Sequence, residues 1–371
     1  MNVRVYLDHA ASTPLDPRVL EAQSPFFSAA NPSGIHQSGQ QAAAALTQAR
    51  QNIAKLLAVK PQELVFTSGG TEANNLAVWG LAKPGSHMLV SPVEHPSVLL
   101  PLERMSVKFG VELEVLPVNG QGLVDPVVLK SRIRLNTALV AIQWANNETG
   151  AVQPVTELAK VTQKAQVPLF CDAAQASPSL DLNPAQLGVD LMSLSAHKLH
   201  GPKGVGLLYV NERLKLEPLV LGGGQERGLR SGTENLPGIW GFAQALALAY
   251  QERTKRVQNF LALTQTLDLA LEGLGQPVLE PQTPVLPQIR SYLFPGFLAQ
   301  RLLMRLDLEG FEVGSGSACS VGNDEPSPVL LAMGLDPALA RSVLRFSFGA
   351  DSRPESLDRL REVMTRILRQ P

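Results

Sequence analysis

Residues 64–91 read LVFTSGGTEANNLAVWGLAKPGSHMLVS, and this stretch decides the fold class of the chain. An apolar run from Leu64 to Thr67 leads through two glycines into helical spacing over Thr71 to Leu81. A second apolar run, His87 to Ser91, follows a turn that contains proline and glycine. A strand, a helix and a further strand in this order form the repeating unit of parallel sheets covered by helices.

The same alternation continues over the first two thirds of the chain. Further helices are expected at residues 36–59, 96–109, 125–134 and 155–165, and further strands at 112–117, 138–144, 167–171, 190–195 and 205–210. The pattern predicts an α/β fold whose large domain has a mostly parallel sheet, of the seven-stranded type, covered by helices on both faces. Ligands of such sheets bind at the carboxyl ends of the strands, so residues that follow strands are the candidates for chemistry.

The last third of the chain differs in composition. A long helical stretch over 236–274 is followed by prolines at 277, 281, 284 and 287, which mark a domain boundary. We therefore predict a large domain over 15–255 and a smaller α+β domain formed by 1–14 and 256–371. Its expected elements are strands at 288–294 and 343–348, a helix at 298–309, and a final helix capped by Ser352 and Glu355.

The charge balance excludes partners that need a strong electric field. The 371 residues carry 32 basic and 33 acidic side chains, so nucleic acid and anionic membranes are not expected partners. The N-terminus has no apolar signal core, and the most apolar helical stretch, 239–250, is too short to span a bilayer. The chain has two cysteines, and Cys171 falls in an expected buried strand. We expect a cytoplasmic, reduced protein that acts on a small molecule.

A lysine stands at the end of an apolar expected strand. In LMSLSAHKLHGPKG, residues 191–204, the run Leu191 to Ser195 delivers Lys198 to the edge of the sheet. Desolvation there lowers the pKa of an amine and makes it able to form a Schiff base with a carbonyl group. The alternative is an ordinary surface lysine.

Three further features follow other strands. The turn SGGT, residues 68–71, opens onto a helix N-terminus, which suits a phosphate group, although helix capping by either hydroxyl explains the turn equally well. Asp172, with Gln175 three residues on, can keep a ring nitrogen protonated or can simply cap a helix. His95 can stack on a flat ring and move protons, or can be a solvated loop residue. Together with a lysine imine, these are the requirements of pyridoxal 5′-phosphate.

Two residues of the last third also carry candidate chemistry. Cys319 lies in SGSACSVGNDEPSP, residues 315–328, a segment too rich in Gly, Ser and Pro for regular structure. A thiol on a loop can travel, and its thiolate is a strong nucleophile, although a bystander thiol is the alternative. Arg345, inside the apolar run 343–348, needs a partner, which can be a substrate carboxylate or an internal ion pair.

Ten short segments, taken in order, carry a family resemblance. They are YLDHAASTP (6–14), NPSGIHQSGQ (31–40), FTSGGTEANNLA (66–77), EHPSV (94–98), NNETG (146–150), DAAQ (172–175), SAHKLHGPKG (195–204), GGGQERGLRSGTEN (222–235), GSGSAC (314–319) and RFSFG (345–349). Over almost its whole length the chain resembles the cysteine desulfurases of the NifS/IscS-like type. These belong to the class V aminotransferase family of fold-type I enzymes, which use pyridoxal 5′-phosphate.

The resemblance implies roles at the cofactor. Lys198 would hold it as a Schiff base and later move the substrate's α-proton, with His95 over the ring as acid and base. Asp172 would pair with the pyridine nitrogen, and Gln175 would face the phenolic oxygen. The phosphate would be bound by Gly70, Thr71, Ser195, His197 and, from a second subunit, Thr233. The active unit is then a homodimer.

The resemblance also implies roles at the substrate, L-cysteine. Arg345 and Asn147 would hold it, and Cys319 would take its sulfur as a persulfide while L-alanine leaves. A sulfur-acceptor protein, such as an iron–sulfur scaffold, would receive the sulfur. The context SGSAC is similar to that of the long-loop group that feeds scaffold proteins, whereas Gln225 stands where close relatives commonly carry histidine.

Other functions use some of the same features. With the same cofactor, an aminotransferase or a cystine or selenocysteine lyase needs no thiol on the loop. A noncatalytic sulfur carrier or scaffold is the alternative outside enzymes. A dinucleotide binder built on Gly222-Gly223-Gly224 is disfavoured because this run is not a strand-linked G-x-G-x-x-G pattern. No metal site is predicted.

Overall fold

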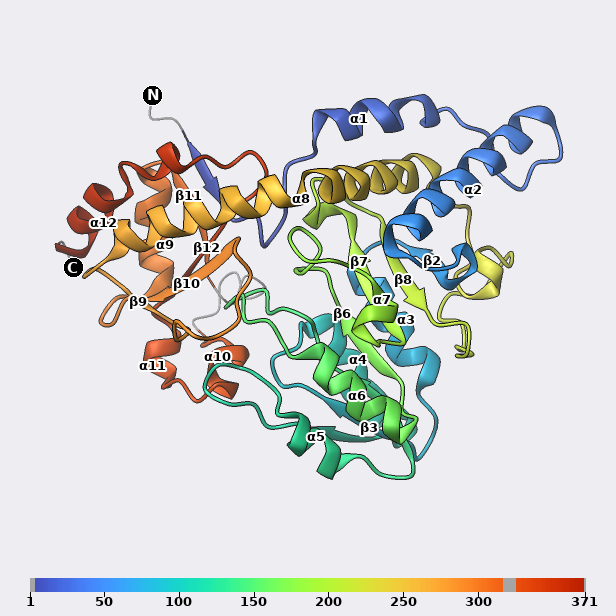
Figure 1. Cartoon of the computed structure of the whole chain (residues 1–371), viewed down its shortest axis with the longest axis horizontal. Helices are drawn as coiled ribbons and strands as arrows, with labels where there is room; N and C mark the ends of the chain where they lie inside the picture. The colour runs from blue at the N-terminus through green and yellow to red at the C-terminus, as the bar shows by residue number, and fades with distance from the viewer. Residues whose placement is uncertain (1–3, 316–324, 370–371) are drawn as a thin grey trace.

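The large domain is built on one seven-stranded sheet. The computed structural model describes residues 4–315 and 325–369, which form two domains side by side (Figure 1). The strands of the large sheet are β2 (Leu64–Thr67), β3 (His87–Val90), β4 (Glu112–Val115), β5 (Thr137–Ala141), β6 (Leu169–Asp172), β7 (Leu191–Ser195) and β8 (Gly206–Val210). Their order is β2-β8-β7-β6-β5-β3-β4; β8 runs antiparallel to both of its neighbours, β2 and β7, and the other neighbouring strands of this sheet pair in parallel. The predicted mostly parallel sheet is confirmed.

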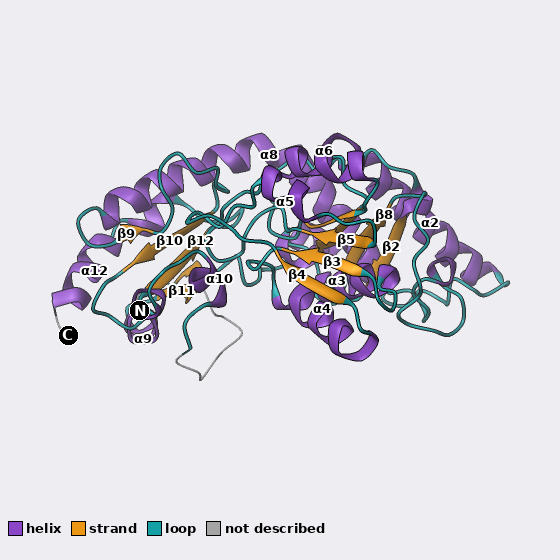
Figure 2. Cartoon of the chain, turned by 90° about the horizontal axis from the view of Figure 1, so that it is seen from below, coloured by secondary structure: helices purple, strands orange, loops and turns teal. Residues whose placement is uncertain are grey.

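The side chains of these strands alternate between two cores because a strand turns successive residues to opposite faces. Leu64 and Phe66 pack into one core and Val65 into the other. One face is covered by α3 (Gly70–Leu81) and α4 (Pro96–Phe109), and the other by α2 (Gln37–Leu57), α6 (Val155–Ala165) and the first half of α8 (Leu236–Leu271). Figure 2 shows these two layers of helices on either side of the strands. The shorter helices of this domain are α1 (Pro17–Gln23), α5 (Pro126–Arg132) and α7 (Pro184–Leu187).

The small domain has a five-stranded sheet and its own core. In spatial order its strands are β1 (Val5–Leu7), β11 (Phe311–Ser315), β12 (Val343–Ser347), β10 (Ile289–Leu293) and β9 (Gln276–Pro277). Its helices are α9 (Ala299–Leu308), α10 (Pro328–Ala332), α11 (Pro337–Ala340) and α12 (Leu360–Arg369). The predicted strands β10 and β12 and the predicted helix α9 are present. The sequence does not predict β1, β9 and β11, because two to five residues carry too little periodicity.

The final helix starts later than predicted. It begins at Leu360, so the predicted capping box of Ser352 and Glu355 is wrong. The hydroxyl of Ser352 instead accepts a hydrogen bond from the backbone N–H of Gly349 (3.0 Å), and a 3-10 turn, Pro354–Leu357, comes before the helix. The apolar face of the helix is buried, as its periodicity predicts.

One long helix, α8, belongs to both domains. Its buried side chains from Ile239 to Ala249 join the core of the large domain, and those from Phe260 to Leu271 join the core of the small domain. Residue 255, where the sequence places the domain boundary, lies between these two parts of the helix. The orientation of the two domains is therefore set along a single helix.

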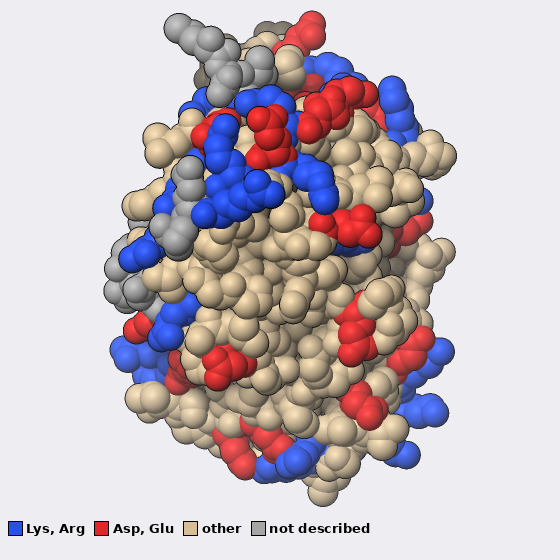
Figure 3. All heavy atoms as spheres, turned by 90° about the vertical axis from the view of Figure 1, so that its left-hand side faces the viewer, with Lys and Arg blue, Asp and Glu red and all other residues tan. Residues whose placement is uncertain are grey.

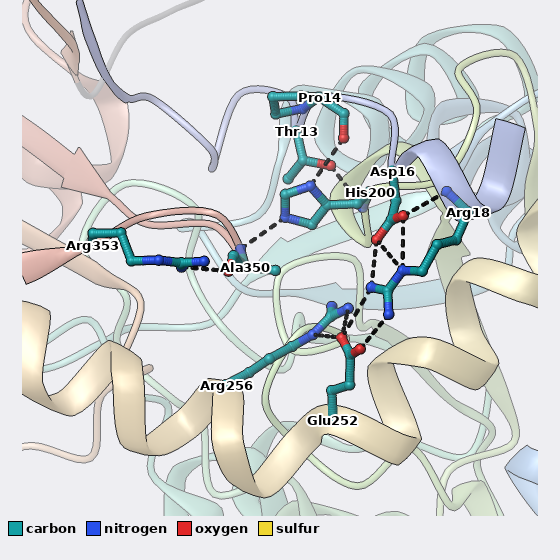
Figure 4. A network of polar contacts seen from close by, with 9 residues as sticks. All are labelled: Thr13, Pro14, Asp16, Arg18, His200, Glu252, Arg256, Ala350 and Arg353. Atoms are coloured by element: carbon teal, nitrogen blue, oxygen red, sulfur yellow. Dashed lines mark hydrogen bonds and ion pairs between the residues drawn. The ribbon is translucent and has the colours of Figure 1, made fainter. Parts of the chain in front are cut away.

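A polar network beside α8 ties it to the start of α1 (Figure 4). Arg18 pairs with Asp16 (2.7 Å) and with Glu252 of α8 (2.5 Å). Arg256, which is 5% exposed, pairs with the same Glu252 carboxylate (2.8 Å). The buried guanidinium of Arg256 needs such a charged partner. Because Glu252 also pairs with Arg18, it joins α1 to α8 close to the point where α8 enters the small domain.

Two histidines lie at the same junction. His200 donates from Nδ1 to the Pro14 carbonyl (2.9 Å) and accepts at Nε2 from the backbone N–H of Ala350 (3.0 Å), so it bridges the two domains (Figure 4). The ligand atoms of His9, His200 and Asp351 lie within 4.8 Å of one another. Because the Nε2 lone pair of His200 is used by a hydrogen bond, we interpret this group as a joint between domains and not as a metal site.

The outer face of the small domain carries acidic and basic side chains next to one another (Figure 3). Arg4 pairs there with Asp307 and with Glu312, and Arg366 of α12 pairs with Glu309. This mixture agrees with the near-neutral composition. Among the described helices, none combines the length and the apolar character that crossing a membrane requires.

The junction generates a prediction about pH and stability. Burial lowers the pKa of His9 to about 4, an effect that Asp351 partly opposes. The folded protein therefore keeps this ring neutral, whereas the unfolded chain takes up a proton near the ordinary pKa of 6.5. The stability that comes from the neutral ring is complete above pH 6.5 and is lost as the pH falls toward 4.

We expect the melting temperature of His9→Gln to depend less on pH in this window than that of the wild type. The other buried histidines remain in both proteins, so the difference between the two pH profiles isolates His9. Thermal melts between pH 7 and pH 4 make the measurement. Parallel profiles for the two proteins would contradict the prediction.

Candidate active site

A pocket of about 770 Å³ lies at the carboxyl edge of the large sheet. Its walls come from the residues that follow β2, β3, β6 and β7, from the N-terminal residues Ala10 to Ser12, and from the small domain. Ten of the residues predicted from the sequence line it: Gly70, Thr71, His95, Asn147, Asp172, Gln175, Ser195, His197, Lys198 and Arg345. Residues far apart in the sequence thus meet where parallel strands end.

Two predicted site residues are not placed in this pocket. Cys319 lies outside the described residues, although Glu325 and Pro326, the first described residues after it, line the pocket. Thr233 is exposed and does not line the pocket of its own chain. Its assignment to the site of a second subunit stays a prediction.

Lys198 is held beneath the N-terminal segment. The residue ends a short 3-10 turn, Ala196–Lys198, that directly continues β7. Its ammonium group donates to the carbonyl oxygens of Ala10 and Ala11, the latter at 2.9 Å. The side chain is half-buried and faces the pocket, which is not the environment of an ordinary surface lysine. Lys203, in contrast, is exposed.

Asp172 and His95 are joined by two residues to which the sequence assigns no role. The side-chain amide of Asn74 donates to the carboxylate of Asp172 (2.7 Å) and to the hydroxyl of Ser97 (2.8 Å). The Ser97 hydroxyl lies 2.7 Å from Nδ1 of His95, and the backbone N–H of Ser97 donates to the same nitrogen (3.1 Å). His95 thereby caps α4 and is not a solvated loop residue. Asp172 also accepts from the N–H of Ala174 (2.9 Å), but the described residues that follow it form a turn and not a helix, so the helix-capping alternative for Asp172 is wrong.

Both histidines of the pocket are held neutral. Burial lowers the pKa of His95, an effect that Asp172 opposes and Lys198 reinforces. Burial, with help from Lys198 and Lys203, lowers the pKa of His197 to about 4. At neutral pH each ring therefore has one N–H and one free lone pair.

The turn before α3 has the features of a phosphate site. Gly69 occupies the N-cap position and no side chain caps the helix, so capping by Ser68 or Thr71 does not explain the turn. The amides of the first helical turn, those of Gly70 and Thr71 included, have no acceptor within the helix. The backbone of β8 lies so close that a Cβ on Gly206 would come within 2.4 Å of the Gly69 backbone. The turn is therefore fixed against the sheet edge.

Arg345 combines the two arrangements that the sequence leaves open. It is 1% exposed, pairs with Asp8 (2.7 Å) and donates to the carbonyl oxygen of Asn147 (2.9 Å). The internal ion pair is thus present. Nε of Arg345 is buried, has no partner within the described part of the chain, and belongs to a side chain that lines the pocket. Donors therefore remain for an anion.

Two buried acids of the pocket have no role in the sequence-based predictions. Glu94 is 2% exposed, and burial raises its pKa well above the ordinary value, although it accepts from the backbone N–H of Gln143 (2.6 Å). Burial also raises the pKa of Glu148 to about 7, against the effects of Ser327 and Arg345. Glu94 directly precedes His95, and Glu148 directly follows Asn147. This adjacency to predicted site residues is the sequence feature from which both acids could have been predicted.

The comparisons with known proteins agree with this site. The family model described as aminotransferase class-V matches residues 5–360, and the chain belongs to this family. Its structural neighbours include a "NIFS-like protein", with a TM-score of 0.91, 34% identity and 99% of each chain covered. The fold is that of the fold-type I enzymes that use pyridoxal phosphate.

Curated relatives extend over the whole chain. A cysteine desulfurase IscS of Dictyoglomus turgidum is 40% identical over 99% of this chain and 95% of its own length. A putative cysteine desulfurase, IscS 1 of Bacillus subtilis, is 40% identical over 95% of this chain and 96% of its own length. DndA from Streptomyces lividans, a solved structure, has a TM-score of 0.77, 34% identity, and coverage of 92% of this chain and 99% of DndA.

Proposed function

We propose that this protein is a cysteine desulfurase that uses pyridoxal 5′-phosphate. It removes the sulfur of L-cysteine, leaves a persulfide on Cys319 and releases L-alanine. The observation that carries the proposal is the meeting of Lys198, Asp172, His95 and Arg345 in one pocket. The names of its relatives along the whole chain support the same reaction.

The donor set of the pocket fits the cofactor. Lys198 would bind it covalently, and the buried Asp172 carboxylate would pair with its ring nitrogen, held in place by Asn74. Gln175 would face the phenolic oxygen. The phosphate would be held by the amides of Gly70 and Thr71 and by Ser195, His197 and the Thr233 of a second subunit. When bound, pyridoxal phosphate acts as an electron sink for the carbon atoms next to the amino group.

Arg345 and Asn147 would hold the substrate. The buried guanidinium offers N–H groups that Asp8 and the Asn147 carbonyl do not use, and a carboxylate is the ligand that suits such a planar edge. Lys198 then stands near the substrate's α-carbon and moves its proton, and His95 exchanges a proton at Nε2. The small domain and the N-terminal segment form part of the pocket wall.

Cys319 completes the reaction. Its Sγ forms a bond to the sulfur of L-cysteine while the Cβ–S bond of the substrate breaks, and protons from the site complete the methyl group of alanine. The thiol and L-cysteine together hold the same atoms as the persulfide and L-alanine, so no external oxidant is needed. A sulfur-acceptor protein, such as an iron–sulfur scaffold, would take the sulfur from Cys319 in the cytoplasm. The enzyme would thereby supply sulfur for the synthesis of iron–sulfur clusters and of other sulfur-containing molecules.

The role of Lys198 gives a first test. Purified wild type should be yellow, and Lys198→Ala should lose the covalently bound cofactor and at least about 100-fold in activity. Lys203→Ala is a matched control, because Lys203 also lines the pocket but is exposed. Visible absorption and sulfide release from L-cysteine are measured for all three proteins. A colourless wild type that cannot be reconstituted would sink the proposal.

The role of Cys319 gives a second test. Cys319→Ser should keep the yellow colour but lose both sulfide release and the gain of one sulfur atom in its intact mass after exposure to L-cysteine. The control is Cys171→Ala, since Cys171 is buried and burial raises its thiol pKa well above the ordinary value. Wild-type-like activity in Cys319→Ser would favour a lyase instead.

The role of Thr233 gives a third test, because it requires a homodimer. We expect Thr233→Ala to bind pyridoxal phosphate more weakly. Co-expressed with Lys198→Ala, it should form mixed dimers that contain one intact site and regain absorption and activity. The shared site would be contradicted if the protein sedimented as a monomer and were fully active. It would also be contradicted if the mixed dimers did not regain absorption and activity.

A further inference from the structure

The hydrogen bonds around Asn74 have only one consistent direction. A side-chain amide nitrogen carries two hydrogens, and the Asn74 amide nitrogen has two acceptors, the Asp172 carboxylate at 2.7 Å and the Ser97 hydroxyl at 2.8 Å. The opposite orientation of the amide would place its oxygen against the carboxylate, which has no hydrogen to donate. Asn74 is 1% exposed, so water cannot replace these contacts.

This direction propagates to His95. Because the Ser97 hydroxyl oxygen accepts from Asn74, its own hydrogen is available to Nδ1 of His95, 2.7 Å away. The backbone N–H of Ser97 donates to the same nitrogen at 3.1 Å. Nδ1 therefore receives two donors and has no room for a proton of its own. The proton of the neutral ring must be on Nε2.

We propose that Asn74 and Ser97 are positioning residues that lock His95 in the tautomer with its proton on Nε2, and that they link this lock to the charge of Asp172. His95 then donates and accepts protons at one atom, Nε2, while Nδ1 stays bound to the start of α4. The effect on activity rests on the proposed function, whereas the tautomer itself does not.

The charged neighbours of His95 fit this assignment. Asp172 on β6 favours the charged ring, and Lys198 after β7 opposes it. Burial raises the pKa of Glu94, the preceding residue, well above its ordinary value, which favours the form without a negative charge. If Nδ1 carried a proton, its N–H would point at the hydroxyl and the backbone N–H of Ser97, which are both donors. The hydrogen bonds to Nδ1 and the burial of the ring thus both favour the neutral form of His95.

Ser97→Ala tests the lock in the complete holoenzyme. It removes one of the two donors to Nδ1, so we expect the acid limb of the kcat/KM pH profile to move up by about 0.5 to 1 pH unit. We expect kcat to fall about 3- to 30-fold, with KM nearly unchanged. Ser97→Thr, which keeps the hydroxyl, should restore the wild-type profile. Ser106→Ala, on the same helix but not lining the pocket, is the control.

A direct readout separates positioning from a merely structural role. With ¹⁵N-labelled histidine, the chain gives six imidazole pairs, and His95→Gln assigns one of them. The wild type should show a protonated Nε2 and an unprotonated Nδ1 for His95, and Ser97→Ala should show a mixture of tautomers. Asn74→Asp keeps the size of the side chain but replaces the amide donor with a carboxylate oxygen. It should disturb the same signal and weaken cofactor retention.

Two outcomes would overturn the proposal. One is a wild-type His95 with its proton on Nδ1. The other is loss of activity in Ser97→Ala with an unchanged pH profile and an unchanged tautomer. If the protein released no sulfide from L-cysteine at all, the proposed function would fail, but the imidazole signals would still decide the tautomer.

Discussion

A single buried carboxylate organises the catalytic edge of the large domain. Asp172 stands at the end of β6 and is 9% exposed, and a charge removed from water costs several kcal/mol unless it is hydrogen-bonded. It obtains those bonds from Ala174 and from Asn74, and Asn74 continues to Ser97. The N-terminal halves of α3 and α4 are therefore fixed relative to β6 by the hydrogen bonds that this carboxylate requires.

The same pocket treats a neighbouring acid in the opposite way. Glu94 is more deeply buried than Asp172, but one of its oxygens has no hydrogen-bond partner within the described residues. Burial therefore raises the pKa of Glu94 well above its ordinary value and favours the neutral carboxyl group. The two carboxyl groups of this pocket thus differ in their donors: Asp172 accepts from Asn74 and Ala174, whereas Glu94 accepts from the backbone N–H of Gln143. Arg345 pairs with Asp8, and this ion pair holds the N-terminal segment whose Ala11 carbonyl accepts from Lys198.

The sequence predicts the large domain well because strands such as β2 and β7 are fully buried and helices such as α6 are periodic. Lys198, Asp172 and His95 are predictable for a related reason, since Asp172 ends a buried strand and the other two residues follow one. Asn74 and Ser97 are not, because their partners lie 98 and 23 residues away and only the fold makes them neighbours. The capping-box prediction at Ser352 fails because its hydroxyl serves the Gly349 turn and Pro354 starts a separate 3-10 turn.

Because α8 contributes to the cores of both domains, its length is constrained as strictly as the identity of a buried side chain. Each residue added between the two buried faces would rotate everything after it by about 100° and shift it by about 1.5 Å. Phe260 would leave the small-domain core, and Arg345 would turn away from the pocket. Sequence drift on the exposed side of this helix can be broad, but a change of one residue in its length would misalign the two halves of the active site.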